Sequence, residues 1–183
     1  MDADTSLAAA QQDMRHGFME GGPGVLASAI VWLVAGGFAL YHSPQAGVIA
    51  LFVGGMLIHP LGMLGCRLLG RPGAQSTGNP LTSLALASTA WMLLCLPLAY
   101  AAFLVRPEWF FPAMLLLIGG RYLCFHTLYG RRGYLVLGAA LGAAGWLLAA
   151  TGASPSTGAW AGGAIEAAFG IYLLARPARL AAA

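Results

Sequence analysis

The sequence predicts an all-α, polytopic transmembrane helical bundle with six spans, and three observations support this fold class. Hydrophobic residues make up 59% of the chain and charged residues only 8%, with a mean hydropathy of +0.76. Apolar residues fall into six stretches, each close to the roughly 20 residues that a spanning helix needs. Only Arg121 and Glu166 place a full charge well inside these stretches. Such a composition excludes a soluble globular domain.

The first three spans are bounded by residues that turn the chain. Span one, Pro23–Tyr41, follows a glycine-rich segment and ends before a Ser-Pro pair. Span two, Gly47–Leu69, ends at a stretch rich in Gly, Pro, Ser and Asn. Span three, Leu81–Val105, begins after an Asn-Pro turn that resembles a helix N-cap.

The last three spans are separated by shorter turns. Span four, Trp109–Gly130, follows an Arg-Pro-Glu turn, and span five, Tyr134–Thr151, follows Arg-Arg-Gly. Span six, Ala159–Ala175, follows a polar stretch of seven residues, 152–158. The chain is thus divided into an N-terminal segment, a six-helix transmembrane domain and a C-terminal tail, at residues 1–22, 23–175 and 176–183.

Arginine placement predicts the orientation of the bundle. With six spans, both termini and the second and fourth loops lie on one side of the membrane. That side carries Arg15, Arg67, Arg71, Arg131, Arg132, Arg176 and Arg179, whereas the other side carries Arg106. Basic loops remain in the cytoplasm, so both termini are predicted there, in a bacterial inner membrane. The polar, acidic N-terminal segment does not resemble a cleaved signal peptide.

The composition also excludes several classes of chemistry. The basic residues are nine arginines and no lysine, which excludes a lysine Schiff base. Topology explains most of these arginines, so we expect no nucleic-acid partner. No zinc-hydrolase, serine-hydrolase or CxxC motif is present, and we predict no catalytic residue, no metal site and no cofactor. Cys66, Cys95 and Cys124 each fall in an apolar span and are interpreted as buried free thiols.

The polar residues inside the spans predict a buried centre of Arg121, Glu166 and His59. At a rise of about 1.5 Å per residue, Arg121 and His59 lie roughly 18 Å from the outer ends of their spans, and Glu166 about 10 Å. An Arg121–Glu166 ion pair would keep both groups charged. Thr89, Tyr122 and His126 are the expected secondary polar contacts.

This centre has two interpretations. A fixed arginine at mid-depth suits a small anionic or carboxylate-bearing ligand, whereas a buried pair that only fixes helix packing is equally compatible with the sequence. His59 precedes Pro60, and such a kinked histidine suits either a gate or ordinary packing. A haem held by His59 and His126 is a further alternative.

A second pattern favours three tandem helical hairpins. Each even-numbered span contains a Gly-Gly pair followed within four residues by its most polar side chain, namely His59, Arg121 or Glu166. Binding sites often lie where the repeats of membrane carriers meet. The alternative is coincidence, because the chain contains 26 glycines.

Two further stretches carry small or polar residues. Gly138 and Gly142 give span five a small-residue face, which is interpreted either as packing within the chain or as a homodimer face. Arg15, His16 and Glu20 precede span one in a glycine-rich stretch. That stretch suits a flexible lead-in, an anion site or the mouth of a cavity at the cytoplasmic side.

Short Gly and Pro motifs occur in the first half of the chain. They are Arg15 to Phe18, Gly22 to Val25, Trp32, Gly54 to Leu57, Pro60, Leu61, and Asn79 to Leu81. Together they resemble a family of small bacterial membrane proteins of unknown function. The resemblance implies a six-span inner-membrane protein and implies no particular activity.

The sequence therefore predicts an integral membrane protein that is transporter-like or binds a ligand at its Arg/Glu/His centre. One alternative is a structural or accessory membrane subunit whose glycine faces serve assembly. A second alternative is a membrane-embedded enzyme that modifies lipids or binds haem.

Overall fold

The computed structural model describes residues 6–175, and their regular structure is entirely helical. The helices are α1 (Leu7–Phe18), η1 (Met19–Gly21), α2 (Gly22–Tyr41), α3 (Pro44–Leu68), α4 (Leu81–Val105), η2 (Pro107–Trp109), α5 (Phe110–Tyr129), α6 (Gly133–Thr151) and α7 (Pro155–Ala175). Six helical stretches are long and apolar enough to cross a membrane, which confirms the predicted fold class. The predicted tail, residues 176–183, lies outside the described residues.

The spans differ from the predicted ones chiefly at the starts of α3 and α7. Helix α3 begins three residues early because the Ser43 hydroxyl accepts a hydrogen bond from the Ala46 amide at 3.1 Å and Pro44 follows it. Helix α7 begins four residues early at Pro155, where the Ser154 hydroxyl accepts from the Thr157 amide at 3.2 Å. Ser43 and Ser154, which the sequence placed in polar turns, are therefore the N-caps of α3 and α7.

The N-terminal segment contains a helix that the sequence analysis did not predict. Helix α1 is capped by Ser6, whose hydroxyl accepts from the Ala9 amide at 3.3 Å. Met19 and Glu20 then take positive φ values of 51° and 56°, which turns the chain into α2. Such angles are unfavourable for residues other than glycine and need support from surrounding contacts. The segment before the first span is thus an ordered helix and a sharp turn.

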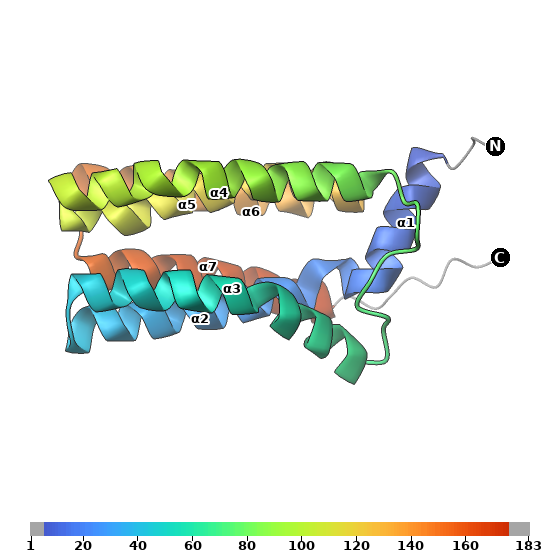
Figure 1. The fold of residues 1–183 in the computed structure, drawn as a ribbon, viewed down its shortest axis with the longest axis horizontal. Coiled ribbons are helices and arrows are strands. Elements are labelled where there is room, and N and C mark those ends of the chain that lie inside the picture. Colours follow the sequence, from blue (N-terminus) through green and yellow to red (C-terminus); the bar gives the residue numbers. More distant parts are fainter. Residues whose placement is uncertain (1–5, 176–183) are drawn as a thin grey trace.

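The spans form two layers of three helices (Figure 1). Helices α2, α3 and α7 make one layer, and α4, α5 and α6 make the other. Helix α1 crosses one end of the bundle, called here the α1 end; the opposite end is called the loop end. The pairs α2/α3 and α4/α5 are hairpins within single layers, whereas α6 and α7 belong to different layers. The third predicted hairpin therefore departs from the arrangement of the first two.

Glycines bring helices of the same layer into close contact. A Cβ atom on Gly119 of α5 would lie 2.8 Å from the Gly138 carbonyl oxygen of α6. A Cβ on Gly138 would likewise lie 2.7 Å from the Gly119 oxygen. Gly138 thus packs inside the chain, whereas the Cβ position of Gly142 is open. A homodimer contact through these two residues stays a prediction.

Large aromatic side chains fill the contact between the layers. Trp32 of α2 is fully buried and lies 6.0 Å from Phe111 of α5, measured between ring centroids. A Cβ on Gly162 of α7 would meet Leu115 at 2.8 Å and Trp32 at 3.0 Å, so α7 sits tightly against both layers. This contact fixes the relative positions of α2, α5 and α7, which carry the central polar residues.

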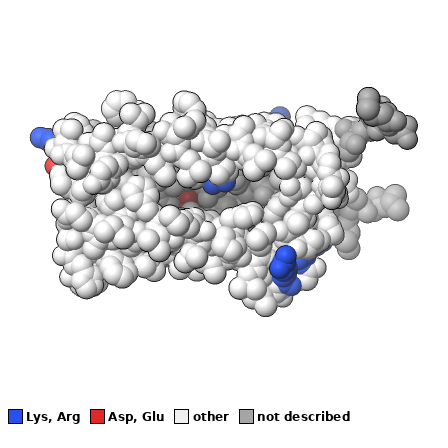
Figure 2. All heavy atoms as spheres, viewed as in Figure 1, with Lys and Arg blue, Asp and Glu red and all other residues white. Residues whose placement is uncertain are grey.

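Away from this contact the layers separate. Figure 2 shows an elongated hollow between them, and in the same view α3 and α4 border it (Figure 1). These two helices follow each other in the chain but do not pack extensively together. They are also the least buried spans, each with 22% of its most apolar window inside the protein. The hollow therefore opens between two helices whose surfaces are largely exposed.

Candidate functional site

Arg121 and Glu166 lie at the same depth in the bundle. Each is eleven residues from the loop-end start of its helix, Phe110 for α5 and Pro155 for α7. A rise of about 1.5 Å per residue places both roughly 16 Å from that end. They are the charged residues in the middle of the described spans, and Figure 2 shows one basic and one acidic patch deep in the central hollow.

The Arg121 side chain is half-buried and points toward α4. Its Nη2 atom donates a hydrogen bond to the Thr89 hydroxyl at 3.1 Å, and its guanidinium carbon lies 5.3 Å from the centroid of the Phe125 ring. The Nε atom is buried and has no hydrogen-bond partner among the described residues. Thr89 and Phe125 therefore hold the guanidinium in place but leave part of its donor capacity unused.

The Glu166 side chain is fully buried, and both of its carboxylate oxygens lack a hydrogen-bond partner among the described residues. The hydroxyl groups of Ser28 on α2 and Tyr122 on α5 are its polar neighbours, but neither has hydrogen-bond geometry. A carboxylate in this position is costly because burial removes water without replacing its hydrogen bonds.

Arg121 and Glu166 interact electrostatically but do not form the expected salt bridge. Glu20 and Arg131 make the ion pair found within residues 6–175. The physical reason is that Thr89 and Phe125 hold the guanidinium on the α4 side, whereas Glu166 faces α2. The structure thus brings the two charges close without joining them.

His59 lies apart from this centre. It is exposed on α3, fifteen residues from Pro44, or about 22 Å from the loop end. His59 is thus displaced in depth from Arg121 and forms no hydrogen bond within the described part of the chain. His126 of α5 is half-buried, with an unpartnered Nδ1 atom. The two histidines stand on different layers, and the haem hypothesis stays a prediction.

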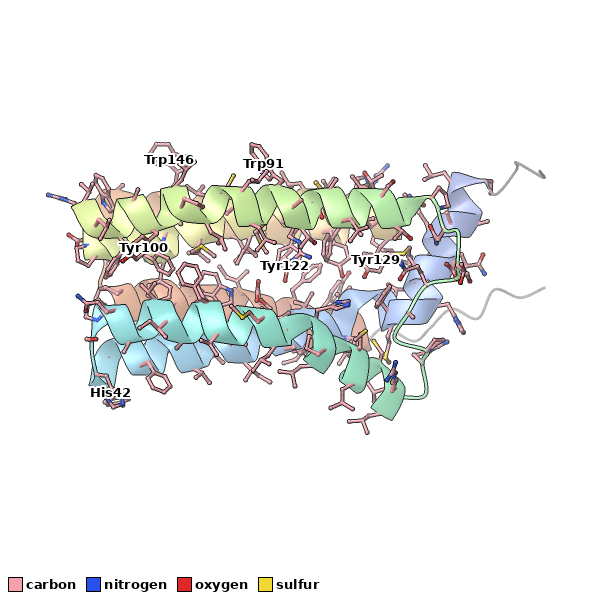
Figure 3. The ribbon with its side chains drawn as sticks, viewed as in Figure 1. His42, Trp91, Tyr100, Tyr122, Tyr129 and Trp146 are labelled. Atoms are coloured by element: carbon pink, nitrogen blue, oxygen red, sulfur yellow. The ribbon has the colours of Figure 1, made fainter. Side chains whose placement is uncertain are left out.

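Tyrosines and Trp32 extend the polar centre beyond the residues singled out by sequence. Tyr122 stacks on Tyr134 with centroids 6.0 Å apart, and Tyr134 stacks on Tyr129 at 5.3 Å. Figure 3 shows Tyr122 and Tyr129 in the gap between the layers. The Nε1 atom of the buried Trp32 lacks a partner among the described residues. Ser28 and Trp32 lie one helical turn apart in α2. Two side chains with polar atoms at this spacing in an apolar span are the sequence feature that could have identified them as site residues.

The comparisons with known proteins give a family but no activity. The sequence model of a family of unknown function, DUF7010, matches residues 7–176. The chain belongs to the DUF7010 family. Neither a curated protein nor a solved structure matches it. The match covers helix α1 and all six spans of this DUF7010 chain, beyond the first half that carried the sequence resemblance.

In this DUF7010 protein, α1 is tied to the C-terminal end of α5. The Gln11 side chain donates to the Thr127 carbonyl at 2.8 Å, and Arg15 donates to the Tyr129 carbonyl at 2.7 Å. Glu20 forms an ion pair with Arg131, although Glu20 Oε2 remains unpartnered within residues 6–175. Arg15 and Glu20, which the sequence placed in a lead-in to span one, therefore hold the N-terminal segment against the α1 end of the bundle.

Helix α1 of the DUF7010 chain is also tied to the loop between α3 and α4. The Asp13 carboxylate accepts hydrogen bonds from the Ser76 amide at 2.9 Å, the Ser76 hydroxyl at 2.6 Å and the Asn79 side chain at 2.7 Å. Partial burial raises the pKa of Asp13, but these hydrogen bonds and the neighbouring His16 outweigh it and lower the pKa below its ordinary value. Helix α1 thus links the two layers at one end.

Within residues 6–175, no group of three or more His, Cys, Asp or Glu side chains is arranged to hold a metal ion. Cys66 and Cys95 are buried free thiols, and Cys124 is half-buried.

A cavity of about 520 Å³ at the α1 end is lined in part by Glu20, Arg131 and Arg132.

Proposed function

We propose that this membrane protein is a small transporter-like or ligand-binding protein whose intramembrane centre consists of Arg121 and Glu166. The observation that carries the proposal is that both charges lie at the same depth inside the bundle with unused hydrogen-bonding capacity. Figure 2 shows a basic and an acidic patch deep in the hollow between the layers. A pair that served only helix packing would be expected to close into a salt bridge, because each group would then be neutralised. His59 is not part of the proposed centre.

Arg121 is the proposed contact for an acidic group of the ligand. A guanidinium presents five N–H donors in a plane and binds carboxylate or phosphate through paired hydrogen bonds. Thr89 occupies one of these donors on Nη2, and Phe125 supports the charged plane. The remaining donors, with the unpartnered Nε atom, suit a carboxylate or phosphate in the hollow.

The proposed setting is a bacterial inner membrane with both termini in the cytoplasm. The arginine asymmetry of the sequence supports this orientation. The α1 end would then face the cytoplasm, and the loop end, with Arg106 and Glu108, would face outward. Arg121 and Glu166 would lie near the middle of the bilayer.

A ligand panel on purified protein tests this function. Thermal unfolding in maltoside micelles is followed with added small carboxylates and phosphates, because a ligand that binds the folded state raises its melting temperature. Arg121→Gln should abolish the shift, whereas Arg67→Gln, an exposed arginine on α3, should preserve it. If no compound in this panel or among amphiphilic analogues stabilises the protein, the centre serves packing and the ligand-binding proposal is wrong.

A further inference from the structure

We infer that the ligand is a membrane amphiphile with a zwitterionic head group, an ammonium beside a phosphate or carboxylate, which reaches the centre between α3 and α4. This inference rests on the proposed function and names its ligand class. It combines two independent observations: the opposite charges of Arg121 and Glu166, and the side on which the hollow opens.

The two charges together select a ligand that carries both signs. A simple anion would satisfy Arg121 but would meet the neighbouring Glu166 carboxylate, which repels it. A simple cation would satisfy Glu166 and be repelled by Arg121. A zwitterion with its anionic group toward Arg121 and its ammonium toward Glu166 avoids both conflicts. It also adds no net charge to a low-dielectric site, which lowers the cost of burial.

The unpartnered atoms further specify the cationic group. Both oxygens of Glu166 lack a hydrogen-bond partner among the described residues. The neighbouring Ser28 and Tyr122 hydroxyls could supply at most one donor each, which leaves acceptor capacity unused. A primary ammonium supplies three N–H donors, whereas a trimethylated ammonium supplies none. The structure therefore favours an ethanolamine-like or amino-acid-like head group over a choline-like one.

The shape of the protein indicates the route. The hollow in Figure 2 lies between the layers and is bordered by α3 and α4, the least buried of the six spans. These helices expose apolar side chains, including Met56 at 77% and Leu94 at 74%. In a bilayer such helices contact acyl chains, so the hollow opens toward lipid.

Helix α1 covers the aqueous approach at one end of the bundle. It is hydrogen-bonded to the loop between α3 and α4 through Asp13 and to the C-terminal end of α5 through Arg15. A water-soluble ligand arriving from this end would have to displace both sets of contacts. An amphiphile that moves sideways from the bilayer meets no such barrier and keeps its chain in lipid.

Four probes test the ammonium, its N–H donors and the acyl chain of the ligand separately. They are added to the native protein in maltoside micelles. Lysophosphatidylethanolamine carries ammonium, phosphate and chain; lysophosphatidylcholine lacks the N–H donors; lysophosphatidylglycerol lacks the cation; glycerophosphoethanolamine lacks the chain. Dissociation constants are measured by calorimetric titration. We expect lysophosphatidylethanolamine to bind at least about tenfold more tightly than each of the others, because each lacks one charge-assisted contact or the buried chain.

Variants assign the two charges to the two ends of the head group. Glu166→Gln should remove the preference for lysophosphatidylethanolamine over lysophosphatidylcholine. Arg121→Gln should weaken all three phosphate amphiphiles by about tenfold or more. Arg67→Gln, an exposed arginine, should leave every constant unchanged. The probe comparison needs no variant, so the inference is tested even if a substitution prevents folding.

Each contrary result has a distinct meaning. Equal affinity for glycerophosphoethanolamine and lysophosphatidylethanolamine would refute the lipid route but leave the proposed binding function intact. Tightest binding of lysophosphatidylglycerol would refute the zwitterion and leave a plain anion site. If neither these probes nor the small carboxylates and phosphates bind, the inference and the proposed function both fail.

Discussion

Arg121 and Glu166 lie at the same depth on different layers, yet the guanidinium is held by Thr89 and Phe125 and forms no salt bridge with the carboxylate. The two charges are not equally exposed, because Glu166 is fully buried and Arg121 is half-buried. Burial without hydrogen bonds penalises the carboxylate more than the guanidinium. Their removal is therefore expected to have opposite effects on stability.

Glu166→Gln should stabilise the ligand-free protein by about 1 to 3 kcal/mol, because the neutral amide removes a buried charge without changing volume. Arg121→Gln should destabilise it by a similar amount, because Glu166 then loses its nearest compensating charge. Chemical unfolding of both variants and the double variant in micelles measures the coupling energy. Strictly additive changes would show that the two charges do not sense each other.

Thr89→Val should lower the free energy of unfolding by about 1.5 to 3 kcal/mol. The change keeps the shape of the side chain but removes the acceptor for Arg121 Nη2, and bonds to charged groups contribute about this much. Thr89→Ser keeps the hydroxyl and is the matched control. A stable Thr89→Val beside a destabilised Thr89→Ser would show that packing of the methyl group, rather than the hydrogen bond, matters.

Acid should release α1 from the loop between α3 and α4. Asp13 lies in α1, outside the spanning helices, and its hydrogen bonds lower its pKa in the folded protein. The contribution of Asp13 is therefore fully present above the unfolded-state pKa of about 4 and is lost as the pH falls through the lowered folded-state value. The protection of the α1 amides, measured as the intrinsic exchange rate at each pH divided by the observed rate, should therefore fall at low pH.

Asp13→Asn serves as the control for this pH effect. It should accelerate exchange in α1 at pH 7, where the native carboxylate is ionised, and differ little from the native protein at pH 2 to 3. A difference that persists unchanged at low pH would mean that the charge of Asp13 does not hold the helix. Exchange in the loop-end half of α5, which begins at Phe110 at the end of the bundle opposite α1, reports any general loss of structure.

The spans could be predicted from sequence because hydrocarbon imposes a simple requirement on length and polarity. The same requirement identified Arg121 and Glu166, since charges inside apolar stretches are rare. Helix α1 was not predicted, because its order depends on distant partners, Ser76 and Tyr129, that no local pattern shows. Starts at Pro44 and Pro155 were misread because capping residues resemble turn residues.

The grouping of the central residues could be predicted only in part. Depth along a helix follows from residue counting, but the direction in which a side chain faces depends on how the helices pack. His59 was assigned to the centre by depth, yet the face of α3 that carries it is exposed. Ser28 and Trp32 were not predicted as site residues, although both are buried. They are buried because Gly162 and Gly163 let α7 approach α2 closely, and the sequence of α2 alone does not show this contact.

The orientation inferred from arginine placement can be tested with reporter fusions. A fusion at Ala183 should show cytoplasmic activity, and an insertion before Pro155, at the loop end, should show periplasmic activity. An insertion between Gly130 and Gly133, beside Arg131 and Arg132, is the internal control on the cytoplasmic side. Cytoplasmic activity before Pro155 would contradict the proposed orientation.

Gly119→Ala should destabilise the bundle, whereas Gly120→Ala should not. A Cβ on Gly119 would lie 2.8 Å from the Gly138 carbonyl oxygen and 3.2 Å from the Gly142 amide nitrogen, and backbone atoms cannot move aside easily. Overpacking of this kind costs about 1 to 3 kcal/mol. The Cβ position of Gly120 is open, so alanine there should be neutral or stabilise by up to about 1 kcal/mol through its higher helix propensity. Unfolding midpoints of the two variants, measured side by side in the same micelles, decide the question. Equal midpoints would show that α5 and α6 do not approach each other as closely as the structure indicates.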